Sequence, residues 1–319
     1  MTLTFFTLAM LLFIGVVAGA VGALSGIGGG AIVVPALVLG YGVSFRSAVA
    51  VSLAAVIANS AMGSATYLRQ GLTHKRLAFS LEIATTIGGI GGSLLTALIP
   101  RAALEGVFGA AQFLSAELTR RRRRLQNRPV PSAPAPQRVP AGGSPLDAPS
   151  LDAPHLDAAP PDALASYGLR ACEGGSALDG LVADETDGTT LAYRARRPLV
   201  GSGASLVAGL LSGMLGIGGG FLKVPAMTLG MGVPVRVATA TSQFMIGITA
   251  VASFVVYYAS GVVQPLLVAP IVLGITAGSL FGSRLAGRVS VAVIEAVYST
   301  VVLASGLSFV LAAFGVIHV

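Results

Sequence analysis

The sequence predicts an all-α polytopic membrane protein made of two internally duplicated halves, with short helices broken by glycine and proline. Only 10% of the 319 residues are charged, whereas about a quarter are charged in a typical soluble domain. Stretches 3–24 and 238–261 carry no charge, and each is long enough to cross ~30 Å of hydrocarbon as a helix. One glycine-rich phrase also occurs twice, as SGIGGGAIVVPALVLGYGV at 25–43 and as LGIGGGFLKVPAMTLGMGV at 215–233.

The duplication has a fixed offset of 190 residues. When residues 17–46 are placed on 207–236 without a gap, direct comparison finds sixteen of thirty positions identical. The same offset pairs Ser52 with Ser242 and Tyr67 with Tyr257 further along. We therefore divide the chain into a first transmembrane repeat at 1–124, a central loop at 125–197 and a second transmembrane repeat at 198–319.

Each half contains five apolar segments. The first segment, 3–24, lacks the basic start of a signal peptide and is interpreted as a first transmembrane helix. The second segment of each half has sixteen residues, about 24 Å as a straight helix, and contains three glycines in succession and a proline. Since proline removes a helix hydrogen bond, Pro35 and Pro225 are expected to be structural breaks. The predicted segments are 3–24, 27–42, 47–68, 78–99 and 102–119, then 199–214, 217–232, 237–259, 265–283 and 290–316.

Basic residues predict the orientation of the two halves. Clusters of arginine flank the central loop at 120–124 and 194–197, which places that loop in the cytoplasm. The loop after Tyr67 is basic, whereas its counterpart SGVVQP at 260–265 is uncharged. Positive charge thus moves to the alternate loop in the second half. This pattern indicates five crossings per half and two repeats that lie inverted in the membrane.

The central loop differs in composition from both flanks. Residues 125–192 are rich in Pro, Ala and Asp, with near-repeats of LDAP, and such a segment buries too little apolar surface to offset its ordering entropy. We expect it to be mostly disordered. A regulatory tether and a tolerated insertion are the two interpretations, and we favour the insertion.

The glycine motif admits two interpretations. GIGGGA superficially fits a dinucleotide fingerprint, but no βαβ unit or acidic partner follows. Small residues can simply let helices pack closely, as we expect for Gly15/Gly19, Gly88/Gly92 and Gly274/Gly278/Gly282. Alternatively, a glycine turn presents free N–H groups at a helix start, which attract anions. Paired broken segments point to a transporter's midplane site, so we favour substrate binding by Gly26, Gly28, Gly29, Gly30, Gly216, Gly218, Gly219 and Gly220.

Polar residues inside the apolar segments complete the candidate substrate site. Lys223 is costly inside a membrane helix; it either reaches an interface or faces an anionic substrate. Glu82 could carry a proton, although an interfacial cap or an ion pair with Lys75 or Arg76 is the preferred interpretation. Hydroxyl and amide groups could bind substrate oxygens, or could satisfy backbone carbonyls of their own helices. The candidates of this kind are Ser52, Asn59, Ser242 and Gln243.

Composition also argues against other classes of protein. The single cysteine, Cys172, gives no disulfide framework and no Cys-based metal site, and no cofactor or metal is expected. The basic residues flank apolar runs, which favours membrane topology over nucleic-acid binding. A serine hydrolase needs a base beside its nucleophile, but the histidines, His74, His155 and His318, fall in loops or at the terminus. We therefore expect no enzymatic activity.

The doubled motif resembles the sulfite exporter TauE/SafE family of bacterial transporters. The resemblance rests on residues 26–30 with Pro35, on 216–220 with Pro225, and on Tyr-x-x-x-Gly at 67–71 and 257–261. It covers about 1–120 and 198–319, and the central loop departs from the family's compact pattern. It implies an inner-membrane transporter, with about eight helices, of sulfite, sulfoacetate or related sulfur-containing anions, and export is the expected direction. The coupling ion would be a proton or a sodium ion, and the chain could assemble with copies of itself. The alternative functions are a passive anion channel and a transporter of another small organic anion.

Overall fold

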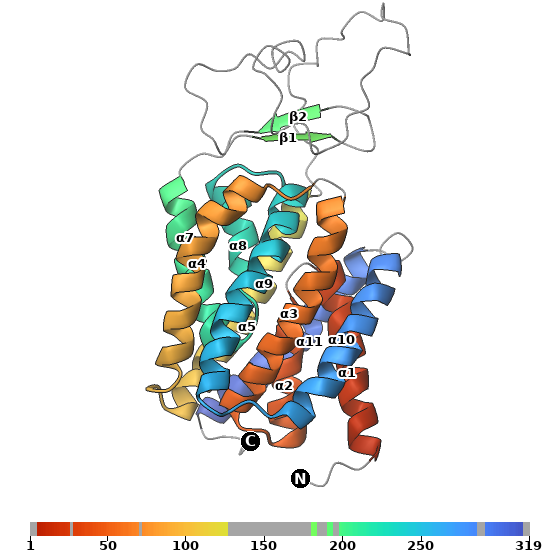
Figure 1. The fold of residues 1–319 in the computed structure, drawn as a ribbon, viewed down its shortest axis with the longest axis vertical. Helices are drawn as coiled ribbons and strands as arrows, with labels where there is room; N and C mark the ends of the chain where they lie inside the picture. The colour runs from red at the N-terminus through yellow and green to blue at the C-terminus, as the bar shows by residue number, and fades with distance from the viewer. Residues whose placement is uncertain are drawn as a thin grey trace, which may run out of the picture.

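The protein is a bundle of helices, which confirms the predicted all-α membrane fold (Figure 1). The computed structural model describes residues 5–25, 28–69, 72–126, 180–183, 190–193, 198–285 and 291–314. The first half contributes α1 (Phe5–Ser25), α2 (Gly30–Tyr41), α3 (Phe45–Arg69), α4 (Lys75–Leu95) and α5 (Arg101–Gln126). The second contributes α7 (Pro198–Leu215), α8 (Gly220–Pro225) with the π-helical turn η2 (Ala226–Gly230), α9 (Val235–Ala259), α10 (Pro265–Leu285) and α11 (Val291–Ala313).

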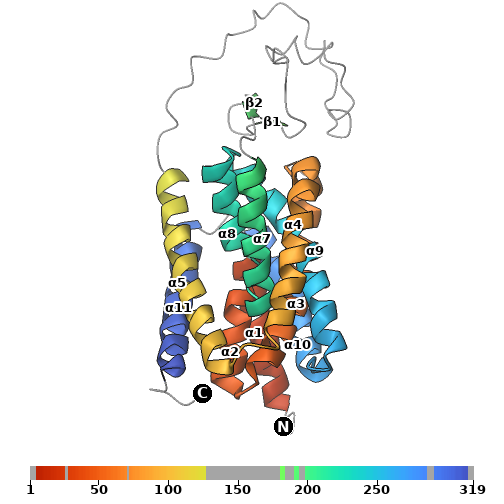
Figure 2. The same ribbon diagram turned by 90° about the vertical axis from the view of Figure 1, so that its left-hand side faces the viewer.

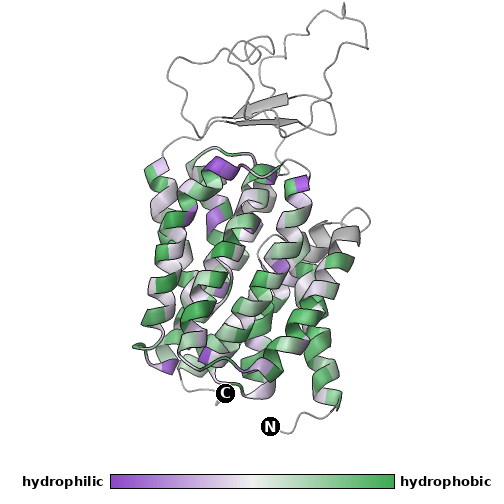
Figure 3. Ribbon diagram, viewed as in Figure 1, coloured by the Kyte–Doolittle hydropathy of each residue, from purple (hydrophilic) through white to green (hydrophobic). Residues whose placement is uncertain are grey.

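The duplication is visible in the helix boundaries. Helices α8, α9, α10 and α11 each begin 190 residues after α2, α3, α4 and α5. Six helices, α1, α3, α4, α7, α9 and α10, are long and apolar enough to cross a membrane by length and composition. Hydrophobic residues cover much of the bundle, and hydrophilic ones are sparse along the helices (Figure 3).

The chain reverses its direction between the halves. Helix α1 begins and α11 ends at one end of the bundle, which we call the terminal end, whereas α5 ends and α7 begins at the opposite end (Figures 1 and 2). The first half therefore runs from the terminal end to the loop end, and the second half returns, as inverted repeats require. Between those points lie two short antiparallel strands, β1 (Gly180–Ala183) and β2 (Thr190–Tyr193). The rest of the predicted central loop, apart from the C-terminal end of α5, lies outside the described residues.

The second segment of each half turns back instead of crossing. Helix α2 has twelve residues, which is about 18 Å at ~1.5 Å per residue, too short for ~30 Å of hydrocarbon. It follows α1 and returns toward the terminal end, where α3 begins (Figure 1). The count of five crossings per half is therefore corrected, because α2 is too short to be a crossing of its own and returns to the end of the bundle from which α1 starts. An odd number of net crossings remains, so the inversion of the halves is unaffected.

Helices of the two halves interleave. Helix α1 packs against α10, α4 against α7, α3 against α9 and α5 against α11, the last pair lying side by side in Figure 2. Glycines permit the first two contacts, as the sequence predicts: a Cβ at Gly278 would collide with the carbonyl of Val16, and one at Gly88 with that of Leu206. These close backbone approaches confirm small-residue packing between membrane helices.

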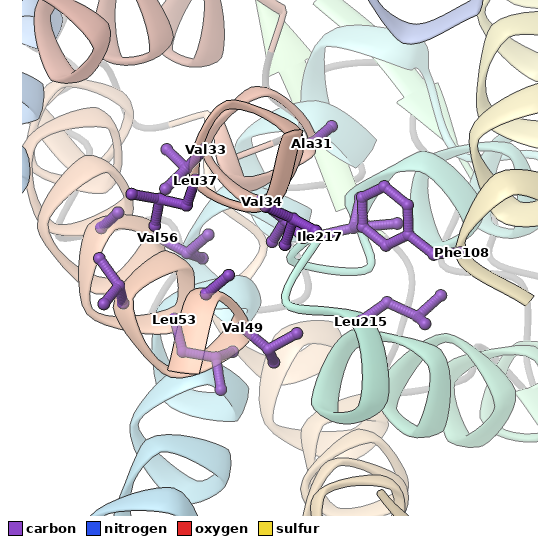
Figure 4. Close-up of a cluster of buried hydrophobic side chains, with 14 of the residues drawn as sticks. Ala31, Val33, Val34, Leu37, Val49, Leu53, Val56, Phe108, Leu215 and Ile217 are labelled. Atoms are coloured by element: carbon purple, nitrogen blue, oxygen red, sulfur yellow. The ribbon is translucent and has the colours of Figure 1, made fainter. Parts of the chain in front are cut away.

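An apolar core surrounds the base of α2. Side chains of α2 and α3 face each other, with Phe108 of α5 and the segment after α7 completing the cluster (Figure 4). The labelled members are Ala31, Val33, Val34, Leu37, Val49, Leu53, Val56, Phe108, Leu215 and Ile217, all of them buried. This packing fixes the short helix at the centre of the bundle, where the glycine turns lie.

Candidate functional site

Two glycine turns open the short helices with the same backbone geometry. Gly28 and Gly29 have φ values of 104° and 75°, and their counterparts Gly218 and Gly219 have 94° and 69°. Residues with a Cβ rarely adopt such angles, so glycine is needed at these positions. Gly29 and Gly219 cap α2 and α8 without any side-chain hydrogen bond. Gly26 lies outside the described residues.

The two turns contact each other in the interior. The hydroxyl of Ser52 lies 2.8 Å from the carbonyl oxygen of Gly216 and 3.3 Å from that of Gly30, so one donor serves both turns. A Cβ at Gly30 would collide with the Gly216 carbonyl oxygen. Close packing, the first of the two interpretations of the motif, is therefore part of its role. The anion-binding interpretation stays a prediction.

The two prolines have different effects on their helices. Helix α2 continues as an α-helix through Pro35. Since proline has no N–H, the carbonyl of Ala31 loses its helical donor, and Nε2 of Gln112 in α5 donates to that oxygen at 2.9 Å. At Pro225 the α-helix instead gives way to the π-helical turn η2. A side chain from another helix thus compensates for one proline, and a change of helix type accompanies the other.

Lys223 belongs to a buried ionic cluster drawn from three elements. It is 1% exposed, and its Nζ donates to Oγ1 of Thr249 in α9 at 3.1 Å. Thr249 in turn donates to Oε1 of Glu82 in α4 at 2.6 Å. The Nζ of Lys223 lies 3.7 Å from the second carboxylate oxygen, Oε2. We call Glu82, Thr249 and Lys223 the ionic cluster.

The ionic cluster corrects two sequence-based interpretations. Glu82 pairs with Lys223, not with Lys75 or Arg76, because α8 brings the lysine against the middle of α4 and α9. Lys223 does not reach an interface, since its side chain is fully buried. Its charge is balanced by the carboxylate, which makes it a paired cation in the bundle interior. Buried charges of this kind are typically paired.

Amides and hydroxyls from α3, α9 and α10 meet beside the glycine turns. Oδ1 of Asn59 accepts a short hydrogen bond from Ser279, and Nε2 of Gln243 donates to the carbonyl of Asn59 at 3.4 Å. Ser60 donates to the carbonyl of Gln243. The structure thus places Asn59 next to Gln243, and Ser52 at the contact between the turns.

Three of the candidate side chains keep a polar atom without a hydrogen-bond partner. Within the described residues, these buried atoms are Nδ2 of Asn59, Oγ of Ser242 and Oε1 of Gln243. Buried polar groups in native proteins are nearly always satisfied, so each such atom needs an explanation. Two of them, the amide nitrogen of Asn59 and the hydroxyl of Ser242, can donate to an anion.

The 190-residue offset relates a residue of the ionic cluster to one of the amides and hydroxyls beside the glycine turns. Asn59 corresponds to Thr249, and Ser52 to Ser242, so each pair occupies equivalent positions on α3 and α9. The two members on one helix are seven residues apart and therefore share a helix face. The charges break this symmetry, because Lys223 corresponds to Val33 and Glu82 to Val272. The sequence comparison located Lys223, but nothing local to Glu82 identified its partner.

Several other polar side chains have structural roles. His74 caps α4, with Nδ1 accepting from the backbone N–H of Leu77. Arg46 donates to the carbonyl of Thr96 at 3.1 Å, and Tyr257 donates to that of Gly213 at 2.9 Å. His155 and His318 lie outside the described residues. Among the residues that the structure describes, no group of His, Cys, Asp and Glu could hold a metal ion.

Membrane-spanning helices in two oppositely directed halves, with paired broken helices meeting among buried polar groups, define a polytopic membrane transporter. The comparison with protein families narrows this class. The chain belongs to the sulfite exporter TauE/SafE family, whose model matches residues 11–309.

A curated relative with a transporter name matches the chain over a shorter stretch. The chain is 38% identical over 101 residues to the "Probable membrane transporter protein YunE" of Bacillus subtilis (strain 168). That match spans 32% of this chain and about a third, 34%, of the relative's length. No solved structure gives a significant match.

Proposed function

We propose that this membrane transporter is a secondary transporter that exports small sulfur-containing anions, such as sulfite or organosulfonates. The proposal places it in a bacterial inner membrane with residues 125–197 on the cytoplasmic side. The observation that carries it is the meeting of two glycine-turn helix starts, which lack side-chain caps, beside buried donors that have no hydrogen-bond partner. Such paired breaks are where transporters bind substrate.

The proposed substrate site combines the glycine turns with polar side chains. The N–H groups of the first two residues of α2 and α8 have no partner within their own helices, and the positive ends of these helices favour negative charge. The amide of Asn59 and the hydroxyl of Ser242 add neutral donors, and Lys223 adds a cation one turn after Gly219. Sulfonate and sulfite oxygens accept hydrogen bonds of this kind. We assign substrate binding to Gly28, Gly29 and Gly30 of the first turn and to Gly216, Gly218, Gly219 and Gly220 of the second. The polar side chains assigned with them are Ser52, Asn59, Lys223, Ser242 and Gln243.

Interleaving of the halves defines how alternating access would operate. Rocking of one half against the other would require the halves to be separate bodies, but α10 packs on α1 and α3, and α4 packs on α7 and α9. The moving units would therefore be composite. Each unit contains a glycine turn, and Ser52 joins the two turns. Breaking that contact would open the substrate site to one side.

Flux measurements in proteoliposomes test the proposed function. Purified protein would be reconstituted and given radiolabelled sulfite, thiosulfate, sulfoacetate and sulfate separately. We expect saturable uptake of at least one sulfur-containing anion and its acceleration by the same unlabelled anion inside the vesicle. Protein-free vesicles are the control. Flux that rises linearly with concentration and shows no such exchange would favour a passive channel; absence of flux for all four anions would refute the proposal.

A further inference from the structure

The ionic cluster holds a carboxylate oxygen that is placed to accept a proton. Oε1 of Glu82 is occupied by hydroxyl donors, Thr249 at 2.6 Å and Thr86 at 3.2 Å. Oε2 is buried and has no hydrogen-bond partner, and the Nζ of Lys223 lies 3.7 Å away from it, beyond normal hydrogen-bond distance. The two oxygens therefore differ: Oε1 already accepts from two hydroxyl groups, and Oε2 is the oxygen left open to a proton.

Lys223 is the cation that balances Glu82 in the interior. On α4 the basic residues Lys75 and Arg76 lie in the first turn, about 10 Å from Glu82 along the axis at ~1.5 Å per residue. Helix α7 carries no titratable side chain, and on α9 the titratable residues Arg236, Tyr257 and Tyr258 lie near its two ends. Ionisable residues inside membrane helices commonly mark proton relays. A proton on Glu82 would thus remove the counter-charge of one identifiable lysine.

The same lysine belongs to the proposed anion site. The backbone N–H of Lys223 donates to the carbonyl of Gly219 at 3.1 Å, so its Cα lies one turn beyond the second glycine turn. The carboxylate and the anion would compete for a single ammonium group. That competition would link the protonation state of Glu82 to the strength of anion binding.

We propose that Glu82 is the proton-binding residue of the transport cycle and that its pairing with Lys223 couples one proton to each transported anion. This inference rests on the proposed function. A proton binds Oε2 of Glu82, the carboxylate becomes neutral, and the ammonium of Lys223 pairs with the anion. When the anion leaves, Glu82 gives up its proton to water on the same side and pairs with Lys223 again. Proton and anion move in the same direction, so net export requires an outward anion gradient that exceeds the inward proton gradient.

Proton-gradient experiments on a matched pair of carboxylate variants test the coupling. Proteoliposomes with the membrane potential clamped would receive radiolabelled sulfoacetate or thiosulfate, which stay ionised near neutral pH, with and without an acid exterior. A trapped pH-sensitive dye would record proton entry. The test variant is Glu82→Gln, which mimics the protonated carboxyl. Glu105→Gln is the control, because Glu105 is also buried but pairs with Arg101 at the start of α5.

The expected results separate coupling from transport itself. With one proton per anion, wild type and Glu105→Gln should accumulate anion about tenfold per unit of pH difference, with matching acidification of the interior. Glu82→Gln should exchange labelled for unlabelled anion at equal pH but lose both responses. A gradient response that survives in Glu82→Gln would overturn the inference. Wild-type transport without proton entry would also overturn the inference, and this result does not depend on whether the variant folds. The proposed function would stay intact in that case. A wild type that moves none of the anions would refute both.

Discussion

The hydroxyl of Ser52 lies 2.8 Å from the carbonyl oxygen of Gly216 and so links the two glycine turns across the duplicated halves. The same oxygen atom of Ser52 lies 3.3 Å from the carbonyl of Gly30 in its own half. A fully buried donor shared by two turns fixes their separation. This contact is therefore the place where a change in the distance between the turns should be felt first.

Ser52→Ala should destabilise the protein by about 1–3 kcal/mol, because two buried carbonyl oxygens lose their shared donor. The change would be measured as a lower midpoint of thermal unfolding in detergent, together with altered anion flux. Ser64→Ala is the control, since the hydroxyl of Ser64 donates to Ala61 in its own helix. Equal unfolding midpoints for the two variants would contradict a structural role for the link between the turns.

Gly30→Ala should abolish flux and lower stability. A Cβ at Gly30 would collide with the carbonyl of Gly216, and it would also crowd the Ser52 hydroxyl. Since the obstacle is backbone, no side-chain rotation relieves it. Gly40→Ala on the same helix is the matched control, because its Cβ would meet nothing within 4 Å. Flux in vesicles and unfolding midpoints would be compared; retention of wild-type flux in Gly30→Ala would count against contact between the turns.

The sequence predicted local features well and contacts between distant segments poorly. Because the repeats are offset by 190 residues, a helix that begins at Gly30 predicts a second helix that begins at Gly220. The glycine triplets predict turns with positive φ, because only glycine adopts such angles at no steric cost. Burial of Glu82 beside Lys223 was not predictable. The two residues are 141 positions apart, and their pairing depends on α4 of the first half packing against α9 of the second. Interleaving of helices is a tertiary property that periodicity does not encode.

Lys223→Met should be strongly destabilising on its own. It would leave the buried carboxylate of Glu82 without its counter-charge, and breaking a buried ion pair in this way costs about 3–5 kcal/mol. The double variant Lys223→Met with Glu82→Gln should recover much of that loss, because no uncompensated charge remains, yet it should not recover anion flux. Unfolding midpoints and sulfoacetate flux would be compared across the four proteins. Additive destabilisation in the double variant would show that the two side chains do not interact.

Gln112→Leu should be more harmful while Pro35 is present. The amide of Gln112 donates to the Ala31 carbonyl that Pro35 leaves without a helical donor. Loss of a buried hydrogen bond should cost about 1–3 kcal/mol. Pro35→Ala restores a backbone N–H four residues after Ala31, so Gln112→Leu should cost less in that background. A double-mutant cycle on unfolding free energy measures the coupling, and independent effects would refute this compensation.

Cysteine labelling from the two sides of the membrane tests the inverted arrangement of the halves. Gln264 precedes α10 at the end of the bundle where α1 begins and α11 ends, whereas Arg76 lies in the first turn of α4 at the opposite end (Figure 1). In a Cys172→Ser background, which removes the single native cysteine, Gln264→Cys should react with an impermeant maleimide added to intact cells. Arg76→Cys, the matched control, should react only after the membrane is opened, because its side is cytoplasmic under the proposed orientation. Both positions are exposed, so access should depend on the side of the membrane alone. Labelling of the two variants from the same side would rule out the reversal of direction between the halves.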